Sequence, residues 1–141
     1  MVSKEFVQNI FSINGKTAIV TGATGALGSA VAWGYGYAGA KVMLTGRNTE
    51  KLVALSEAMK KEGIECIYSA GDPAIEADTT RIVNETVKKY GELNILCCCH
   101  GYSKPGSILE QATEDWQEMM DANVKGTYLF SKYAAKQMVA D

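Results

Sequence analysis

The fold of this 141-residue chain is decided by the run Thr17-Ala18-Ile19-Val20-Thr21-Gly22-Ala23-Thr24-Gly25-Ala26-Leu27-Gly28. Its first five residues form a short apolar run that predicts a buried strand, and a helix is predicted over residues 28–38. The turn between them is rich in glycine. Glycines allow a tight turn in which backbone N–H groups approach a phosphate, and the helix N-terminus adds a positive dipole end. Three glycines between a strand and a helix therefore favour a phosphate-binding loop over a plain connecting turn.

The same alternation of strand and helix continues along the chain. Strands are predicted over residues 41–44, 65–69 and 93–98, and helices over residues 49–62, from 72, from 113 and over 128–139. Asp72 and Pro73 suit the cap and the first position of the third helix, and Thr113 suits the cap of the fourth. The apolar faces expected from helical spacing contain Leu52, Leu55 and Met59, then Ile75, Ile82 and Thr86, then Trp116, Met119, Met120 and Val124.

Strands of this length separated by helices predict βαβ units with a parallel sheet and helices on both faces. The predicted fold class is α/β, a Rossmann-type doubly wound parallel sheet in a single domain over residues 1–141. In such a sheet the ligand crevice lies beyond the carboxyl ends of the strands. Functional residues are therefore expected just after Val20, Leu44, Ser69 and Cys98.

Composition excludes several other classes of function. The net charge is −2 at pH 7, which gives no basis for a nucleic-acid partner or an anionic membrane surface. No run approaches the ~20 apolar residues of a membrane span, and no signal peptide is apparent, so a cytoplasmic protein is expected. Cys97 and Cys99 would share one face of a strand while Cys98 faces away, so they and His100 do not suit a metal site. We expect no metal, and cysteines that are small buried strand residues.

The end of the second strand bears on the choice of cofactor. A site that prefers NAD places an acid there to bind the ribose hydroxyls, but this chain has Gly46 at that position, within Thr45-Gly46-Arg47-Asn48. Glycine leaves room for a 2′-phosphate, and Arg47 can pair with it through two hydrogen bonds. The alternative is that Arg47 is a solvated turn residue. The segment favours NADP(H) over NAD(H).

The stretch Asn14-Gly15-Lys16-Thr17-Ala18-Ile19-Val20-Thr21-Gly22 and the loop after it resemble the opening of short-chain dehydrogenases/reductases. The usual TGxxxGxG loop of that family is replaced by TGxxGxxG, with Ala26 where the middle glycine normally lies. The resemblance runs from Phe11 onward and covers the first half of the family. It implies hydride transfer between a nicotinamide and an alcohol or carbonyl. The cofactor-binding residues that it implies are Gly22, Thr24, Gly25, Leu27, Gly28, Arg47, Asn48, Asp72 and Gly101.

Two later segments show how far the resemblance extends. The family usually has Asn-Asn-Ala-Gly after the fourth strand, and only Gly101 of Cys98-Cys99-His100-Gly101 matches it. His100 is expected to line the cleft, with general acid/base catalysis as the alternative. Asn123 matches the asparagine of the family's catalytic tetrad, which helps to hold a water in the proton relay; otherwise it is an asparagine at a helix kink. Residues 101–106 look faintly like members that act on gluconate-type sugar acids.

The family's catalytic serine, tyrosine and lysine normally follow a fifth strand, and the sequence ends before that strand. Tyr128 and Lys132 have the Tyr-x-x-x-Lys spacing, but they are expected on a helix surface. The chain is thus interpreted as the cofactor-binding half of an oxidoreductase, truncated after the fourth strand and its following helices, and we expect it to be inactive alone. An apolar edge over residues 93–98 predicts a marginal fold or self-association as a homo-oligomer. The alternatives are a non-catalytic nucleotide-binding module and a truncated remnant without cofactor affinity.

Overall fold

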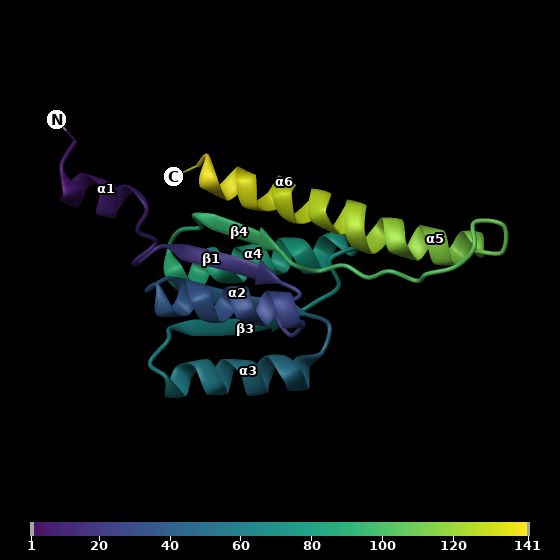
Figure 1. Cartoon of the computed structure of the whole chain (residues 1–141), viewed down its shortest axis with the longest axis horizontal. Coiled ribbons are helices and arrows are strands. Elements are labelled where there is room, and N and C mark those ends of the chain that lie inside the picture. The colour runs from purple at the N-terminus through teal and green to yellow at the C-terminus, as the bar shows by residue number, and fades with distance from the viewer. Residues whose placement is uncertain (1, 141) are drawn as a thin grey trace.

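The computed structural model describes residues 2–140 and contains a four-stranded parallel sheet (Figure 1). Its strands are β1 (Thr17–Thr21), β2 (Lys41–Gly46), β3 (Cys66–Ala70) and β4 (Ile95–Cys98). The strand order is β3-β2-β1-β4, and every neighbouring pair is parallel. The predicted Rossmann-type α/β sheet is confirmed.

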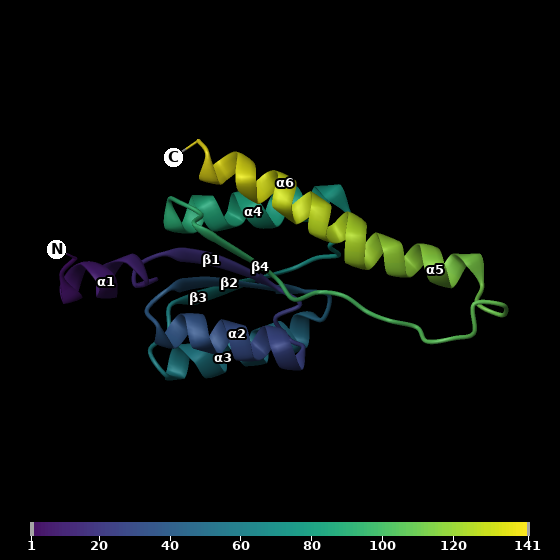
Figure 2. The same ribbon diagram turned by 45° about the horizontal axis from the view of Figure 1, so that its top comes forward.

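Helices cover both faces of the sheet (Figure 2). α2 (Ala26–Tyr37) and α3 (Thr49–Lys61) lie on one face, and α4 (Glu76–Tyr90) and α6 (Gly126–Met138) lie on the other. Each face buries its own apolar cluster. The first is built around Val20, Ala32, Val42, Leu44, Leu52 and Met59, and the second around Ile19, Met43, Ile82, Val83, Leu93 and Phe130.

The sequence patterns of β1 and β4 reflect their different places in the sheet. β1 is central and every residue in it is buried, which explains its continuous apolar run. β4 is an edge strand, and all four of its residues are only partly buried. Cys97 and Cys99 pack against the α2/α3 cluster, whereas Cys98 packs against the α4/α6 cluster. The predicted alternation of the cysteines is confirmed.

The predicted start of the third helix is wrong. α4 begins at Glu76 with Ile75 as its N-cap residue, and Asp72 instead closes a turn in which its Oδ1 accepts a hydrogen bond from Ala74 N at 2.9 Å. An aspartate side chain that bonds to the backbone two residues later competes with helix formation. Since Ile75 precedes the helix, it is 52% exposed and does not belong to the buried face.

The chain ends in one long helical rod. α5 (Thr113–Met120) passes through a π-helical turn, η1 (Asp121–Lys125), into α6. Thr113 is the first residue of α5 rather than its cap, because Ala112 holds the N-cap position and no side chain caps the helix. The rod projects beyond the sheet (Figure 2), and Trp116, on the apolar face expected from helical spacing, is 48% exposed.

A helix that the sequence patterns did not predict lies near the N-terminus. α1 (Lys4–Ile10) is capped by Ser3, whose Oγ accepts a hydrogen bond from Phe6 N at 3.0 Å. It lies apart from the sheet (Figure 1) and leaves Ile10 exposed. Among residues 2–140, no helix has the length and apolar character needed to cross a membrane.

Candidate functional site

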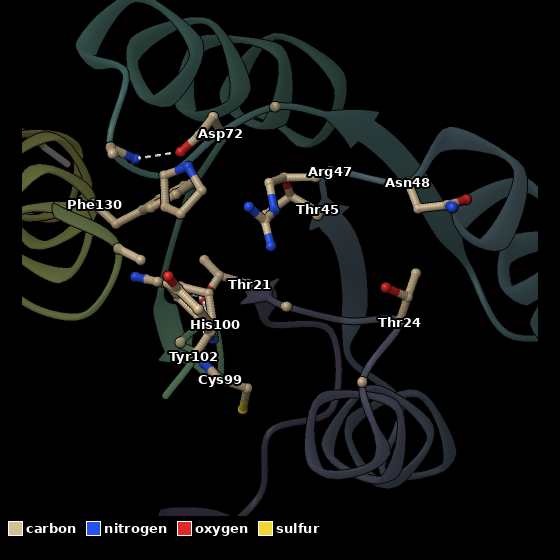
Figure 3. Close-up of a pocket in the computed structure, with 18 of the residues that line it drawn as sticks. Thr21, Thr24, Thr45, Arg47, Asn48, Asp72, Cys99, His100, Tyr102 and Phe130 are labelled. Atoms are coloured by element: carbon tan, nitrogen blue, oxygen red, sulfur yellow. Dashed lines mark hydrogen bonds between the residues drawn. The ribbon is translucent and has the colours of Figure 1, made fainter. Parts of the chain in front are cut away.

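A cleft of about 990 Å³ opens at the carboxyl ends of the strands (Figure 3). All four strands contribute to it through the segments that follow them, as the doubly wound topology predicts. Its lining residues include Thr21, Gly22, Thr24, Gly25, Thr45, Arg47, Asn48, Lys51, Asp72, His100, Gly101, Tyr102 and Glu118.

The loop from β1 to α2 is held by close backbone contacts. Gly22 has φ +59°, and a Cβ there would lie 2.7 Å from Cys99 O. A Cβ on Gly28 would lie 2.2 Å from Gly22 O. Both positions therefore require glycine. Ala26 is exposed at the start of α2, so its departure from the usual glycine pattern leaves this packing intact.

The N-terminus of α2 faces the cleft without a side-chain cap. Gly25 is the N-cap residue and has no side chain to bond the first helical N–H groups. Those groups lack partners within the helix and form the positive end of its dipole. Gly25 and Thr24 line the cleft at this point, so an anion there would meet unpaired backbone donors.

Two cations lie at the end of the cleft formed by β2 and α3. Figure 3 shows the Arg47 side chain directed into the cleft, and Lys51 also lines it. Within residues 2–140 neither cation forms an ion pair. Asn48 points away from Arg47 (Figure 3), and its Oδ1 accepts a hydrogen bond from Lys51 N at 2.9 Å as the cap of α3. The side-chain oxygen of Asn48 is therefore used by the fold.

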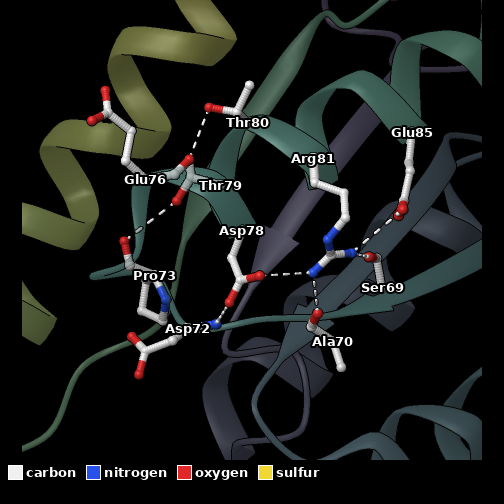
Figure 4. A network of polar contacts seen from close by, with 10 residues as sticks. All are labelled: Ser69, Ala70, Asp72, Pro73, Glu76, Asp78, Thr79, Thr80, Arg81 and Glu85. Atoms are coloured by element: carbon white, nitrogen blue, oxygen red, sulfur yellow. Dashed lines mark hydrogen bonds and ion pairs between the residues drawn. The ribbon is translucent and has the colours of Figure 1, made fainter.

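A polar network fixes Asp72 at the opposite wall (Figure 4). Asp72 N donates to Asp78 Oδ2 at 2.9 Å, and Asp78 Oδ1 pairs with Arg81 at 3.1 Å. The bond from the Asp72 N–H, followed by the Arg81 guanidinium, lowers the pKa of the Asp78 carboxyl. Arg81 also donates to Ser69 Oγ and Ala70 O, both at 2.6 Å. The network ties the start of α4 to the end of β3.

His100 joins β1 to the long helical rod. Its Nδ1 lies 2.6 Å from Thr21 Oγ1, and its Nε2 lies 3.4 Å from Thr127 Oγ1. Thr21 Oγ1 already accepts hydrogen bonds from the backbone N–H groups of Cys99 and His100. With both lone pairs used, Thr21 Oγ1 cannot also accept from Nδ1; its proton goes to Nδ1 at 2.6 Å rather than to the more distant Cys97 O at 3.4 Å, which leaves the His100 proton on Nε2. Burial lowers the pKa of His100, in agreement with a neutral ring.

Asn123 fixes the loop that follows β4. Its Oδ1 accepts from Tyr102 N at 2.9 Å, and its Nδ2 donates to Tyr102 O at 2.8 Å. A Cβ on Gly101 would lie 2.6 Å from Asn123 Oδ1, so glycine permits this close approach. Asn123 lies in η1, where the helix departs from α geometry. Tyr102 lines the cleft, and its hydroxyl donates to Glu118 Oε2 at 2.8 Å.

The structure brings most of the predicted binding residues together. The cleft is lined by Gly22, Thr24, Gly25, Arg47, Asn48, Asp72 and Gly101. Leu27, Gly28 and Asn123 lie outside the lining: Leu27 is 70% exposed, Gly28 packs on Gly22, and Asn123 acts on the Tyr102 backbone.

His100 lines the cleft as expected. Tyr128 and Lys132 do not line it, and Lys132 instead bonds to Glu76 on the helix surface at 3.3 Å. Sequence reasoning missed Lys51 and Tyr102 as lining residues. The place of Lys51 in the first turn of α3, directly after Arg47 and the Asn48 cap, was the available signal. In the part of the chain that the structure describes, no three His, Cys, Asp or Glu side chains gather as metal ligands.

A parallel sheet of this order, with a glycine-lined cleft at its carboxyl edge, defines a Rossmann-type α/β protein. The family model described as short chain dehydrogenase matches residues 16–141, and the chain belongs to that family of oxidoreductases. Membership implies a nicotinamide dinucleotide, NAD or NADP, as cofactor.

Curated relatives include two dehydrogenases with assigned substrates. Glucose 1-dehydrogenase of Gluconobacter oxydans is 38% identical over 116 residues, which is 82% of this chain and 44% of that protein. The 2-dehydro-3-deoxy-D-gluconate 5-dehydrogenase of Formosa agariphila is 31% identical over 132 residues, 93% of this chain and 50% of that protein.

A solved short-chain type dehydrogenase/reductase from Mycobacterium ulcerans has the same fold. It superposes with a TM-score of 0.88 at 34% identity, covering 92% of this chain and 49% of that one. The chain thus spans about half the length of the relatives it matches.

Proposed function

We propose that this chain forms the NADP(H)-binding half of an oxidoreductase that transfers hydride between the nicotinamide and an alcohol or carbonyl. One observation carries the choice of NADP(H): the Arg47 side chain points into the cleft without an ion-pair partner among residues 2–140. Gly46, where an acid would favour NAD, agrees with that choice. A 2′-phosphate supplies the charge that Arg47 lacks.

The residues at the rest of the cleft fit a dinucleotide. The uncapped N-terminus of α2 and the close-packed backbone of the Gly22 loop suit a diphosphate. Lys51 lines the same cleft as Arg47 and adds a second cation. The Asp72 carboxylate at the wall formed by β3 suits the adenine, as the family resemblance implies.

The bound nicotinamide would supply or accept the hydride. The residues of this chain would hold and orient it, and His100 would remain a neutral ring that fixes the wall of the cleft. Asn123 would act by fixing the Tyr102 backbone. The substrate class proposed is a polyol, sugar or sugar acid, since the names of both curated relatives contain such compounds.

The proposal is tested by titrating the purified chain with NADPH and with NADH, using nicotinamide fluorescence and calorimetry. Hydrogen bonds to charged groups contribute about 1.5 to 3 kcal/mol. Arg47→Ala should therefore weaken NADPH binding about 10- to 100-fold and leave NADH binding nearly unchanged. Lys60→Ala, an exposed cation at the far end of α3, is the matched control and should change neither affinity.

Equal loss of both affinities in Arg47→Ala would contradict the assignment of Arg47 to the 2′-phosphate. Absence of binding to either nucleotide would favour the remnant over any cofactor-binding role.

A non-catalytic nucleotide-binding module is the second candidate function. It is favoured by the positions of Tyr128 and Lys132, which have the family's spacing but lie outside the cleft. Both candidates predict cofactor binding, so peptide mapping of the protein from its natural source separates them. A chain that continues into Ser and Tyr-x-x-x-Lys and reduces carbonyl substrates with NADPH supports the oxidoreductase.

A further inference from the structure

Cys97 and Cys99 hold two thiols side by side on the edge strand. Their Sγ atoms are 3.5 Å apart, both cysteines are free, and both are only partly buried. Cys98 lies between them in sequence but packs against the opposite face of the sheet. Figure 3 shows the Cys99 sulfur directed away from the centre of the cleft. Cys99 belongs to the lining of the cleft, but its thiol and that of Cys97 face the α2/α3 side of the sheet.

The separation of the sulfurs selects the kind of atom that both can bind. An atom bound to both sulfurs, with bonds of about 2.3 Å as in a zinc–thiolate bond, would have a sulfur–atom–sulfur angle of roughly 100° at the observed separation of 3.5 Å. That angle suits a pyramidal trivalent centre and does not suit a linear one. Since no third His, Cys, Asp or Glu joins the pair within residues 2–140, the remaining position must be filled by a substituent that the centre brings with it.

We propose that Cys97 and Cys99 form a dithiol site for a monosubstituted trivalent arsenic compound, R–As=O. The two S–H bonds break and two As–S bonds form, while the oxygen of the As=O group leaves as water with the two thiol protons. Arsenic stays trivalent throughout, so the step needs no oxidant or reductant. The site does not depend on the proposed cofactor function.

The environment of the pair separates this reaction from ordinary thiol modification. Burial, reinforced by the neighbouring Cys97, raises the pKa of Cys99 to about 11. Cys99 is therefore protonated at neutral pH and reacts slowly with alkylating reagents, which require a thiolate. The arsenic reaction uses both thiols in their protonated form and releases water. We therefore expect it to go to completion under conditions in which alkylation of Cys99 is slow.

Phenylarsine oxide is the probe, added to the native chain in a phosphine reductant and followed by intact-mass spectrometry. One phenylarsenic group should bind per chain, and an excess of a small dithiol should remove it. Linked donors can exceed a single donor by about 100-fold or more in affinity. Cys97→Ser and Cys99→Ser should each weaken binding by at least that factor.

Cys98→Ser is the matched control, since it removes an adjacent thiol from the other face and should bind the probe as the unaltered chain does. Loss of binding in Cys98→Ser, or its survival in Cys99→Ser, would overturn the assignment to Cys97 and Cys99.

A second measurement avoids variants that fail to fold. The arsenic-bound chain and an arsenic-free sample are unfolded in urea, where burial no longer raises the thiol pKa values, and are alkylated; both are then digested and fragmented to locate the unmodified cysteines. Protection of Cys97 and Cys99 with alkylation of Cys98 supports the site, whereas protection of an adjacent pair contradicts it.

Discussion

Replacing Gly28 with alanine should destabilise the chain, although alanine favours helices more than glycine does. Gly28 lies in the first turn of α2, where an added Cβ would be 2.2 Å from Gly22 O and 2.8 Å from its carbonyl carbon. Both sides of this contact are backbone, so no side chain can rotate away. We therefore place the cost at the upper end of the range for overpacking, about 3 kcal/mol.

Helix propensity returns about 1 kcal/mol of that cost. The net expectation for Gly28→Ala is a loss of about 2 kcal/mol in the free energy of unfolding. Gly34→Ala is the matched control, because the same substitution in the same helix meets nothing within 4 Å. It should stabilise the chain by about 1 kcal/mol.

The two variants should therefore differ by about 3 kcal/mol with opposite signs relative to the unaltered chain. Urea unfolding followed by far-ultraviolet circular dichroism, at one protein concentration, measures both. If Gly28→Ala were as stable as Gly34→Ala, the close approach of α2 to the Gly22 carbonyl would be refuted as the reason for glycine at position 28.

Three further results are expected. Burial lowers the pKa of His100 in the folded chain, so the unfolded chain binds more protons below about pH 6.5 and stability falls as the pH drops. In urea unfolding at pH 5.5 and 7.5, His100→Gln should show a smaller change in the free energy of unfolding between the two pH values than the unaltered chain does. An unchanged pH dependence would exclude His100 as the cause. Asn123→Ala removes both hydrogen bonds to the Tyr102 backbone, so the hydrogen-exchange rate of the Tyr102 amide should rise about 10-fold. An unchanged rate would show that the loop is held by other contacts. Asp78→Ala leaves the Asp72 N–H without its acceptor and should lower the free energy of unfolding by about 1 to 2 kcal/mol. Asp78→Asn keeps an acceptor oxygen and should lower it less. Equal losses in the two variants would assign the effect to the charge of Asp78 instead.

The sheet and its glycine loop could be predicted from sequence because burial on both faces leaves a continuous apolar run. β1 carries that run, and the loop after it is determined by local sterics at Gly22 and Gly28. The positive φ of Gly22 and the contact of Gly28 with Gly22 O involve only nearby residues of the chain, and the sequence displays them directly.

The start of α4 and the exposure of Trp116 could not be predicted, for two different reasons. Asp72 and Pro73 have the residue types of a helix start, but the Asp72 carboxylate bonds to Ala74 N and forms a separate turn. Helical spacing shows that Trp116 lies on an apolar face, yet spacing does not indicate whether another element covers that face. The rod extends past the sheet, and the side chain is left 48% exposed.

The arrangement around His100 required the tertiary structure. Its partner Thr21 lies 79 residues earlier in the chain, and no periodicity links the two. Sequence could place His100 near the cleft because it follows the last residues of a strand, but its tautomer follows only from counting the hydrogen bonds at Thr21 Oγ1.

The π-helical turn η1 sets the rotational phase between α5 and α6. Successive residues of an α-helix are turned by about 100° around its axis, and a π-helical turn accommodates an additional residue without breaking the helix. Deleting one residue from Asp121–Lys125 would restore α geometry and rotate α5 by about that angle relative to α6. Glu118 would then leave its place against Tyr102, and the wall of the cleft after β4 would lose its support. The length of this turn, counted in single residues, thus determines which side of α5 the cleft meets.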